Sequence, residues 1–205
     1  MKPINEFKGE YSFLSNFYPC KVEVLGRTYP SAEHAYQALK TNDIQKREEI
    51  CKAPTAKEAK ALGRKLALRP KWDADRTLYM ELVVTAKFLQ NPDLKKKLLD
   101  TGDAELVEGN YWKDKFWGMF QGKGENHLGK ILMKVRHDFK VLNSKPKDIK
   151  PAKKIENQLY GLYYDGKYLR TYRTLNFVNG AKTQRAKYGD QTDLSKFEVV
   201  EYIKK

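Results

Sequence analysis

The chain has 205 residues and a net charge of +14, from 40 basic and 26 acidic side chains. This length predicts one domain, or one domain with a small appendage. No apolar run approaches the roughly 18 residues that a membrane span requires, and the N-terminus lacks the apolar segment of a secretory signal. The two cysteines, Cys20 and Cys51, lack the CxxC spacing of a metal or redox site. We therefore expect a cytoplasmic protein with reduced thiols and no metal centre.

The excess of positive charge predicts attraction to phosphate groups and an association that weakens with salt. The alternative is a surface that only keeps the protein soluble, because lysine-rich stretches such as residues 95–97 are usually just solvated. The charge thus favours a partner that binds the basic surface, either a nucleic acid or a nucleotide ligand.

The first forty residues predict strands, turns and then a helix. Residues 20–25 alternate between polar and apolar side chains, which is typical of a half-buried strand. Ser31 is a plausible N-cap for a helix that runs to about Lys40. A second helix start is indicated at Thr55, because Thr55 and Glu58 have the spacing of a capping box.

The middle of the chain predicts further helices around an aromatic loop. Residues 72–89 form an amphipathic pattern whose apolar stripe includes Val83, Ala86 and Leu89. Residues 94–99 and 128–139 predict two shorter helices, and residues 110–124 between them predict an aromatic loop.

A change of composition divides the chain. Residues 143–154 are polar and proline-bearing, which predicts a linker between a domain at 1–142 and a small basic domain at 155–205. Within the second domain, Asp165-Gly166 predicts a hairpin turn, residues 175–188 a short helix, and residues 197–203 a last strand. We expect a ββαβ-like appendage that folds alone or leans on the main domain.

Two side chains of the first predicted helix could act on a ligand together. Glu33 and Lys40 are seven residues apart, which is two helical turns and about 10 Å along the axis. A carboxylate can move protons, and a partly desolvated lysine can be a neutral nucleophile. The alternative for Glu33 is a capping acid that the helix dipole stabilises.

The aromatic loop allows two interpretations. Asp114 lies between Trp112 and Trp117, so the loop could be a hydrophobic clasp in which the carboxylate binds nearby backbone amides. It could instead be a stacking wall for a flat base, with Asp114 bonded to a sugar or base edge. Trp72, between a lysine and an aspartate, is equally open to both interpretations.

Other polar groups are less informative. Asn16, followed by Phe17 and Tyr18, could satisfy local backbone or contact a ribose or phosphate. The sequence contains no Walker A, HExxH or GxSxG pattern, and its three histidines are scattered, so a metal is not indicated.

Taken in order, these segments resemble the NADAR/YbiA-like family over about residues 5 to 139. The resemblance is carried by Tyr11-Ser-Phe-Leu-Ser-Asn-Phe-Tyr-Pro19, Tyr29-Pro-Ser-Ala-Glu-His-Ala-Tyr-Gln37 with Lys40, Ala59-Lys-x-Leu-Gly-Arg64, Trp72, Ala86-Lys-Phe88, Leu98-Leu-x-Thr-Gly102, Leu106-Val-Glu108, Asp114-x-x-Trp-Gly118 and Asn126-x-Leu-Gly-Lys-Ile-Leu-Met133. It implies an α+β fold that is mainly helical with a small sheet. The β-rich C-terminal appendage lies outside it.

The resemblance also implies a cofactor-free hydrolase that cleaves a ribosyl–nitrogen bond. Some members are similar to enzymes that cleave riboflavin-pathway intermediates, and others remove ADP-ribose from guanine in nucleic acid. We expect the second activity, a reversal of ADP-ribosylation on a nucleotide or on DNA. The alternatives are a glycosidase of riboflavin intermediates and a non-catalytic module that binds ADP-ribose or nucleic acid.

Residue roles follow from the same resemblance. Glu33 would shuttle protons, Lys40 would attack the anomeric carbon as a Schiff-base nucleophile, and Asp114 would orient ribose hydroxyls. Lys87 also lies in a matching segment and is the alternative amine. The expected substrate-binding residues are Asn16, Phe17, Tyr18, Trp72, Trp117, Gly118 and Asn126.

Overall fold

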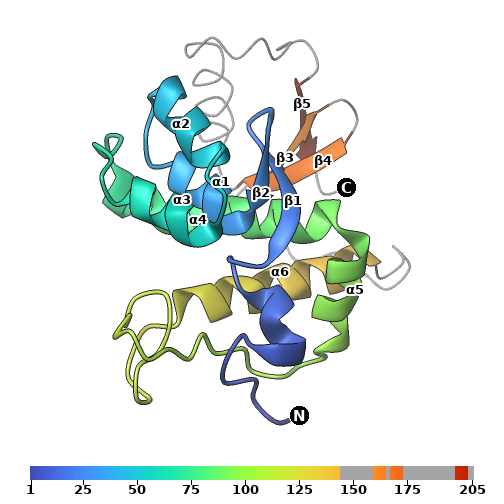
Figure 1. Cartoon of the computed structure of the whole chain (residues 1–205). Helices are drawn as coiled ribbons and strands as arrows, with labels where there is room; N and C mark the ends of the chain where they lie inside the picture. Colours follow the sequence, from blue (N-terminus) through green and yellow to red (C-terminus); the bar gives the residue numbers. More distant parts are fainter. Residues whose placement is uncertain (144–158, 165–166, 173–196, 203–205) are drawn as a thin grey trace. The chain divides into compact units, whose positions relative to one another are not determined.

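The computed structural model describes residues 1–143, 159–164, 167–172 and 197–202. Its contacts divide the chain into two units, Met1–Asn143 and Ser144–Lys205. The first unit is mainly helical and contains one two-stranded sheet (Figure 1). This confirms the mainly helical fold with a small sheet that the resemblance implied. Among the described helices, none combines the length and the apolarity that a bilayer crossing needs.

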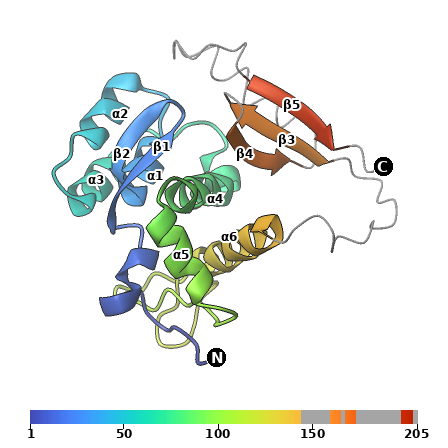
Figure 2. The same cartoon turned by 90° about the vertical axis from the view of Figure 1, so that its right-hand side faces the viewer.

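A short 3₁₀ helix, η1 (Gly9–Leu14), leads into an antiparallel hairpin of β1 (Pro19–Val24) and β2 (Arg27–Ser31). Val22 and Val24 of β1 are buried while their neighbours are more exposed, so the predicted half-buried strand is confirmed. The two views show the hairpin beside α1 (Ala32–Ala38) and α4 (Trp72–Gln90), with which it makes most of its helix contacts (Figures 1 and 2).

The helix starts agree with the local sequence signals. The Ser31 hydroxyl accepts a hydrogen bond from the His34 backbone N–H at 3.3 Å and caps α1. The Thr55 hydroxyl accepts from the Glu58 N–H at 3.2 Å and caps α3 (Ala56–Gly63). Both predicted caps are confirmed. Helix α1 ends at Ala38, two residues before the expected end, so Lys40 lies in the turn that follows.

Helix α2 (Ile44–Cys51) was not expected from the sequence. Its only buried side chain is Ile50, so it has no apolar stripe that periodicity could reveal. Asp43 caps it by accepting from the backbone N–H groups of Gln45 and Lys46 at 2.8 and 3.1 Å. A local cap, rather than an apolar face, therefore marks where this helix begins.

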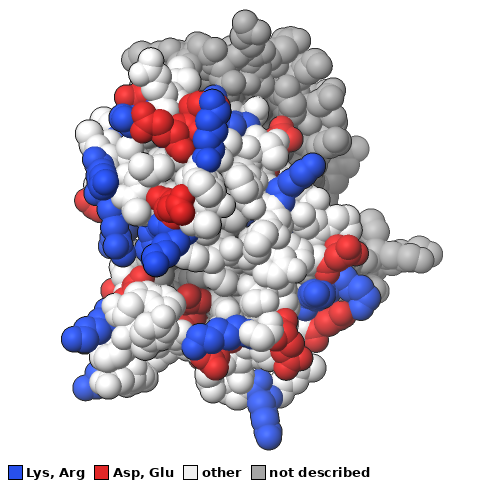
Figure 3. All heavy atoms as spheres, viewed as in Figure 1, with Lys and Arg blue, Asp and Glu red and all other residues white. Residues whose placement is uncertain are grey.

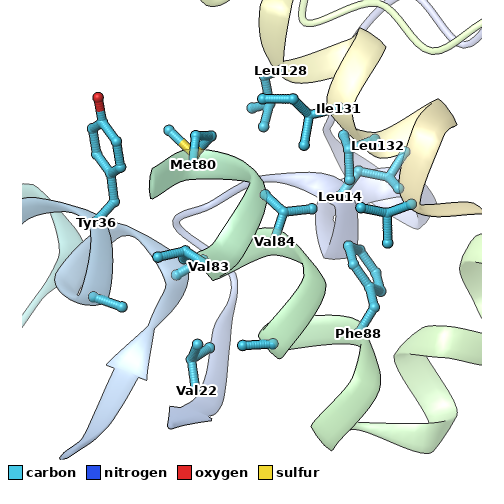
Figure 4. Close-up of a cluster of buried hydrophobic side chains, with 14 of the residues drawn as sticks. Leu14, Val22, Tyr36, Met80, Val83, Val84, Phe88, Leu128, Ile131 and Leu132 are labelled. Carbon is cyan, nitrogen blue, oxygen red and sulfur yellow. The ribbon is translucent and has the colours of Figure 1, made fainter. Parts of the chain in front are cut away.

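Helix α4 is the centre of the first unit. It contacts β1 and α1, and also α5 (Pro92–Asp100) and α6 (His127–Asn143). Figure 4 shows Leu14, Val84 and Leu132 meeting between α4 and α6, and all three are fully buried. Leu89, which the predicted stripe included, is 38% exposed, whereas its neighbour Phe88 is fully buried.

The segment between α5 and α6 has little regular structure and is held by bonds to distant parts of the chain. Ile4 forms an isolated parallel bridge with Leu106. Asn126, just before α6, donates from Nδ2 to the Leu106 carbonyl at 2.9 Å and accepts at Oδ1 from the Glu108 N–H at 3.0 Å. These bonds fix the position of residues 104–109 against the N-terminus and the start of α6.

The second unit is described only through its strands. β3 (Leu159–Tyr164), β4 (Lys167–Tyr172) and β5 (Phe197–Tyr202) form an antiparallel sheet in the order β4-β3-β5. The predicted turn at Asp165-Gly166, the predicted helix over 175–188 and the linker at 143–154, apart from residue 143, fall outside the described residues. The ββαβ-like appendage and its domain boundary therefore stay predictions.

We expect Gly129→Ala in α6 to destabilise the protein. A Cβ at this position would collide with the Leu106 carbonyl oxygen and lie 2.6 Å from Asn126 Nδ2. Overpacking of this kind costs about 1–3 kcal/mol. Urea unfolding should show that loss, whereas Lys130→Ala, at the adjacent exposed position, should change stability by no more than about 0.5 kcal/mol. Equal stabilities of the two variants would contradict this packing.

Candidate active site

Glu33 lies in the first turn of α1 and is only 5% exposed. Its backbone N–H donates to the Asn16 carbonyl at 2.9 Å, and its Oε1 accepts from Gln37 Nε2 at 2.7 Å. Ser31 provides the cap, and the Glu33 carboxylate accepts its hydrogen bond from the side chain of Gln37. The geometry therefore argues against the interpretation of Glu33 as a capping acid and leaves its carboxylate available for a role in the site.

Opposing effects act on the Glu33 carboxyl group. Burial is the largest effect and raises its pKa above the ordinary value, while Lys60, the hydrogen bond from Gln37, Lys40 and Arg64 lower the pKa in part. Lys60 belongs to α3 and Arg64 is its C-cap residue. Three cations from two neighbouring elements thus surround a carboxylate that would otherwise be costly to bury in ionised form.

Lys40 belongs to the same group of charges. Its Nζ lies 5.8 Å from the centroid of the Tyr36 ring. Burial lowers the pKa of the amine, Glu33 raises it, and Lys60 and Arg64 lower it further. Lys40 is therefore coupled to Glu33 although it lies beyond the end of the helix, and it has the lowered pKa that a nucleophilic lysine needs.

An aromatic cluster adjoins these charges, with Tyr36 at its centre. The Tyr36 ring centroid lies 5.3 Å from that of Trp72 and 5.5 Å from that of Trp117. Trp72 also stacks on Tyr79 at 5.3 Å with the planes 12° apart. The Tyr36 ring thus brings together the two tryptophans predicted from the sequence. Burial raises the pKa of the Tyr36 hydroxyl.

The loop that carries Trp117 is shaped by Asp114. Its Oδ1 accepts from the backbone N–H groups of Phe116 and Trp117 at 3.0 and 2.9 Å. These bonds are the ones expected for the first of the two interpretations of the loop, in which the Asp114 carboxylate binds nearby backbone amides. Trp112 is half exposed and packs edge-on against Tyr111, with ring centroids 5.1 Å apart. Of the two loop tryptophans, Trp117 is the one that contacts the Tyr36 ring.

The segment before β1 contributes one buried amide and one exposed ring. Asn16 Nδ2 lies 3.1 Å from the Met80 sulfur, and Asn16 Oδ1 is buried without a hydrogen-bond partner among the described residues. Phe17 is 41% exposed, with Lys60 Nζ 5.5 Å from its ring centroid. The Tyr18 ring instead faces Lys87, whose Nζ lies 5.7 Å from its centroid. Asn16 thus contacts Glu33 through its backbone carbonyl and Phe17 contacts Lys60, whereas the Tyr18 ring contacts Lys87 instead.

Lys87, the alternative amine, is fully buried in α4. Its Nζ donates to the Ser15 carbonyl at 2.7 Å, and burial lowers its pKa to about 8. The charged or polar groups that act on it are Cys20 and Glu108, whereas Glu33 acts on Lys40. The arrangement favours Lys40 as the partner of Glu33 and gives Lys87 a supporting contact to the loop before β1.

Gly118 and Asn126 both contact the segment that carries Glu108. A Cβ at Gly118 would collide with the Glu108 carbonyl oxygen and lie 2.9 Å from Asn110 Nδ2. Both polar ends of the Asn126 side chain are bonded to the backbone of residues 106 and 108. In this structure the two residues hold Glu108 in place, and their expected contact with a substrate stays a prediction.

Sequence reasoning did not select several residues of this group, which are Tyr36, Gln37, Lys60, Arg64 and Glu108. The first two were within its reach, because they lie three and four residues after Glu33 and share its side of a helix. Figure 3 shows basic side chains gathered over the side of the molecule where Figure 1 places α3 and the start of α4. Among the described residues, no three His, Cys, Asp or Glu side chains are grouped to hold a metal ion.

Residues 4–140 match the NADAR domain family, and the chain belongs to this family. The NMR structure of YbiA from Escherichia coli resembles this chain with a TM-score of 0.64 and 34% identity, over 72% of this chain and 92% of that one.

Two curated relatives are named N-glycosidases. YbiA of Escherichia coli is 36% identical over 135 residues, which are 64% of this chain and 84% of YbiA. The protein from Nostoc punctiforme is 41% identical over 140 residues, 65% of this chain and 89% of the relative. A riboflavin biosynthesis protein of Vibrio vulnificus is 44% identical over 132 residues, 63% of this chain but only 36% of the relative. The matched region thus spans about a third of the Vibrio protein.

We expect Lys87→Met to change the pH dependence of stability. Burial lowers the Lys87 pKa from 10.5 to about 8. Below pH 8 the folded protein therefore holds a charged amine in a buried position, and this lowers its stability. That loss of stability disappears as the pH rises to 10.5. The difference corresponds to about 3 kcal/mol at about 1.4 kcal/mol per pKa unit. The free energy of unfolding of the variant, relative to wild type, should therefore fall by about this amount between pH 7 and pH 11.

Lys57→Met, at an exposed position of α3, is the matched control. Its stability relative to wild type should stay nearly constant over the same range of pH. A constant difference for Lys87→Met as well would show that this amine titrates normally in the folded protein.

Proposed function

We propose that this protein is an N-glycosidase that cleaves a ribosyl–nitrogen bond. The observation that carries the proposal is the coupling of the buried Glu33 carboxylate to the Lys40 amine, whose pKa is lowered, beside the Tyr36 aromatic cluster. The names of the YbiA and Nostoc relatives support the same reaction type. Aromatic surfaces with a few convergent polar groups suit a ligand that combines a flat base with a sugar.

The proposed reaction uses both charged groups. The neutral Lys40 amine attacks the anomeric carbon, forming a carbon–nitrogen bond as the bond to the base breaks and its electron pair goes to the departing nitrogen. Glu33 takes the proton that the amine loses. The adduct opens to an imine of the ribose, which water hydrolyses to free sugar and free lysine. Asp114, whose Oδ1 is held by the backbone, would use its other oxygen to orient ribose hydroxyls.

The substrate class we propose is guanine that carries ADP-ribose, as a nucleotide or in DNA. Lys60 and Arg64 lie in the Glu33 group and would suit the diphosphate, and the net charge of +14 would favour a nucleic acid. Trp117 and Tyr36 would contact a base. The second candidate is a riboflavin-pathway intermediate, which the name of the Vibrio relative supports. A module that binds ADP-ribose or nucleic acid without cleaving it is the third.

We expect Glu33→Gln to lower the rate of ribosyl–nitrogen cleavage by about 10²–10⁴-fold, the range for loss of a group that transfers protons. Chromatography of the released base or sugar measures this rate. Glu58→Gln, at an exposed position of α3, is the matched control and should keep the wild-type rate. Unchanged turnover in Glu33→Gln would reject its role, and binding without turnover in the wild type would favour the non-catalytic module.

The imine predicts that borohydride will trap the enzyme on its substrate. Mass spectrometry of the intact protein should show the sugar attached in the wild type and in Lys87→Ala, but not in Lys40→Ala. Trapping that survives in Lys40→Ala and vanishes in Lys87→Ala would assign the nucleophile to the other lysine. No adduct in any of the three proteins, under conditions of turnover, would reject the covalent step.

A further inference from the structure

Glu108 lies beside the candidate active site and has no part in the reaction described above. Its backbone is fixed from two sides. The N–H donates to Asn126 Oδ1 at 3.0 Å, and the carbonyl accepts from the Met119 N–H at 2.9 Å. A Cβ at Gly118 would also lie 2.9 Å from Glu108 Cγ, so the glycine leaves space for this side chain. The structure thus fixes the backbone that carries this carboxyl group and leaves room for the side chain beside Gly118.

One carboxyl oxygen of this side chain lacks a hydrogen bond in the described part of the chain. Glu108 Oε2 is buried and has no hydrogen-bond partner there. An ionised carboxylate oxygen in such a position is costly, because burial removes its water without replacing the hydrogen bonds. A neutral carboxylic acid costs less, and it presents one O–H that can be donated to a ligand.

The charges around Glu108 differ from those around Glu33. Asp114 from the aromatic loop and Glu33 from α1 are negative neighbours of Glu108, while Lys60 of α3 and Lys87 of α4 are positive ones. Burial is the largest effect, and together they raise the pKa of Glu108 to about 7. Burial raises the pKa of Glu33 as well, but its charged neighbours are the cations Lys60, Lys40 and Arg64, which together with a hydrogen bond from Gln37 act in the opposite direction. Two neighbouring carboxyl groups with neighbours of different charge, one among cations and one beside other carboxylates, can divide the roles of acid and base.

We propose that Glu108 is the acid that protonates the departing nitrogen, while Glu33 is the base that serves the Lys40 amine. This rests on the proposed N-glycosidase function. As the bond between the anomeric carbon and the base breaks, its electron pair goes to the nitrogen, which takes the proton of Glu108. Glu33 receives the proton that the attacking amine loses. During hydrolysis of the imine by water, one proton passes back from Glu33 to Glu108 through solvent, and both groups return to their starting states.

The test is the pH dependence of cleavage in Glu108→Gln and in the matched control Glu105→Gln, an exposed glutamate of the same segment. A general acid must be protonated to act, so kcat/KM of the wild type should fall as the pH rises through about 7. Glu105→Gln should reproduce that fall. Glu108→Gln should be slower by about 10²–10⁴-fold and lose this alkaline limb. Wild-type turnover in Glu108→Gln, or a loss that keeps the limb, would overturn the proposal.

A second measurement needs no substrate and no altered residue in the titrated protein. The ¹³C signal of the Glu108 carboxyl, assigned by its absence in Glu108→Gln, should titrate near pH 7 in the wild-type full chain. Titration near the ordinary glutamate value of 4.5 would overturn the role of Glu108 even if the enzyme is active. A wild type that cleaves no ribosylated base would instead reject the underlying function, so the two failures are distinguishable.

Discussion

The burial of one carboxylate at the start of α1 is the constraint on which the rest of the site depends. Glu33 loses nearly all of its contact with water, which would strongly favour its neutral form. The Gln37 hydrogen bond and the positive charge of Lys60, Lys40 and Arg64 offset part of this effect. Those cations come from α3 and from the turn after α1, so the contact between α1 and α3 determines the electrostatics of the site.

A second set of contacts connects this carboxylate to the aromatic loop. Tyr36, one turn after Glu33, contacts Trp72 at the start of α4 and Trp117 from the loop. Asp114 sets the loop by bonding to its backbone. Elements far apart in the sequence therefore meet around one turn of one helix, and rings and charges lie side by side there.

Local features of the fold could be predicted because each depends on a few neighbouring residues. The caps at Ser31 and Thr55 and the half-buried strand β1 are of this kind. The apolar stripe of α4 was partly wrong, because this helix packs against elements on several sides and buries Phe88 and Lys87 while exposing Leu89. Helix α2 was missed because it buries little.

In the candidate site, too, some residues could be predicted from the sequence and others could not. The order of the motifs was enough to select Glu33, Lys40, Trp72 and Trp117, which the structure places in one connected group. Tyr36 was within reach of helical spacing. Lys60 and Glu108 were not, because their approach to Glu33 depends on how α3 and the segment before the aromatic loop pack against α1. Such long-range contacts leave no periodic pattern in a single sequence.

The most direct test of the central claim is to incubate the full chain with DNA that carries ADP-ribose on guanine, in parallel with a free ribosylaminopyrimidine. Mass spectrometry would then identify the products. We expect free ADP-ribose and restored guanine from the first substrate, at a rate above that for the second. Preferential cleavage of the pyrimidine would move the substrate assignment to the riboflavin class. Recovery of both substrates intact would contradict the claim that this group of residues breaks a ribosyl–nitrogen bond.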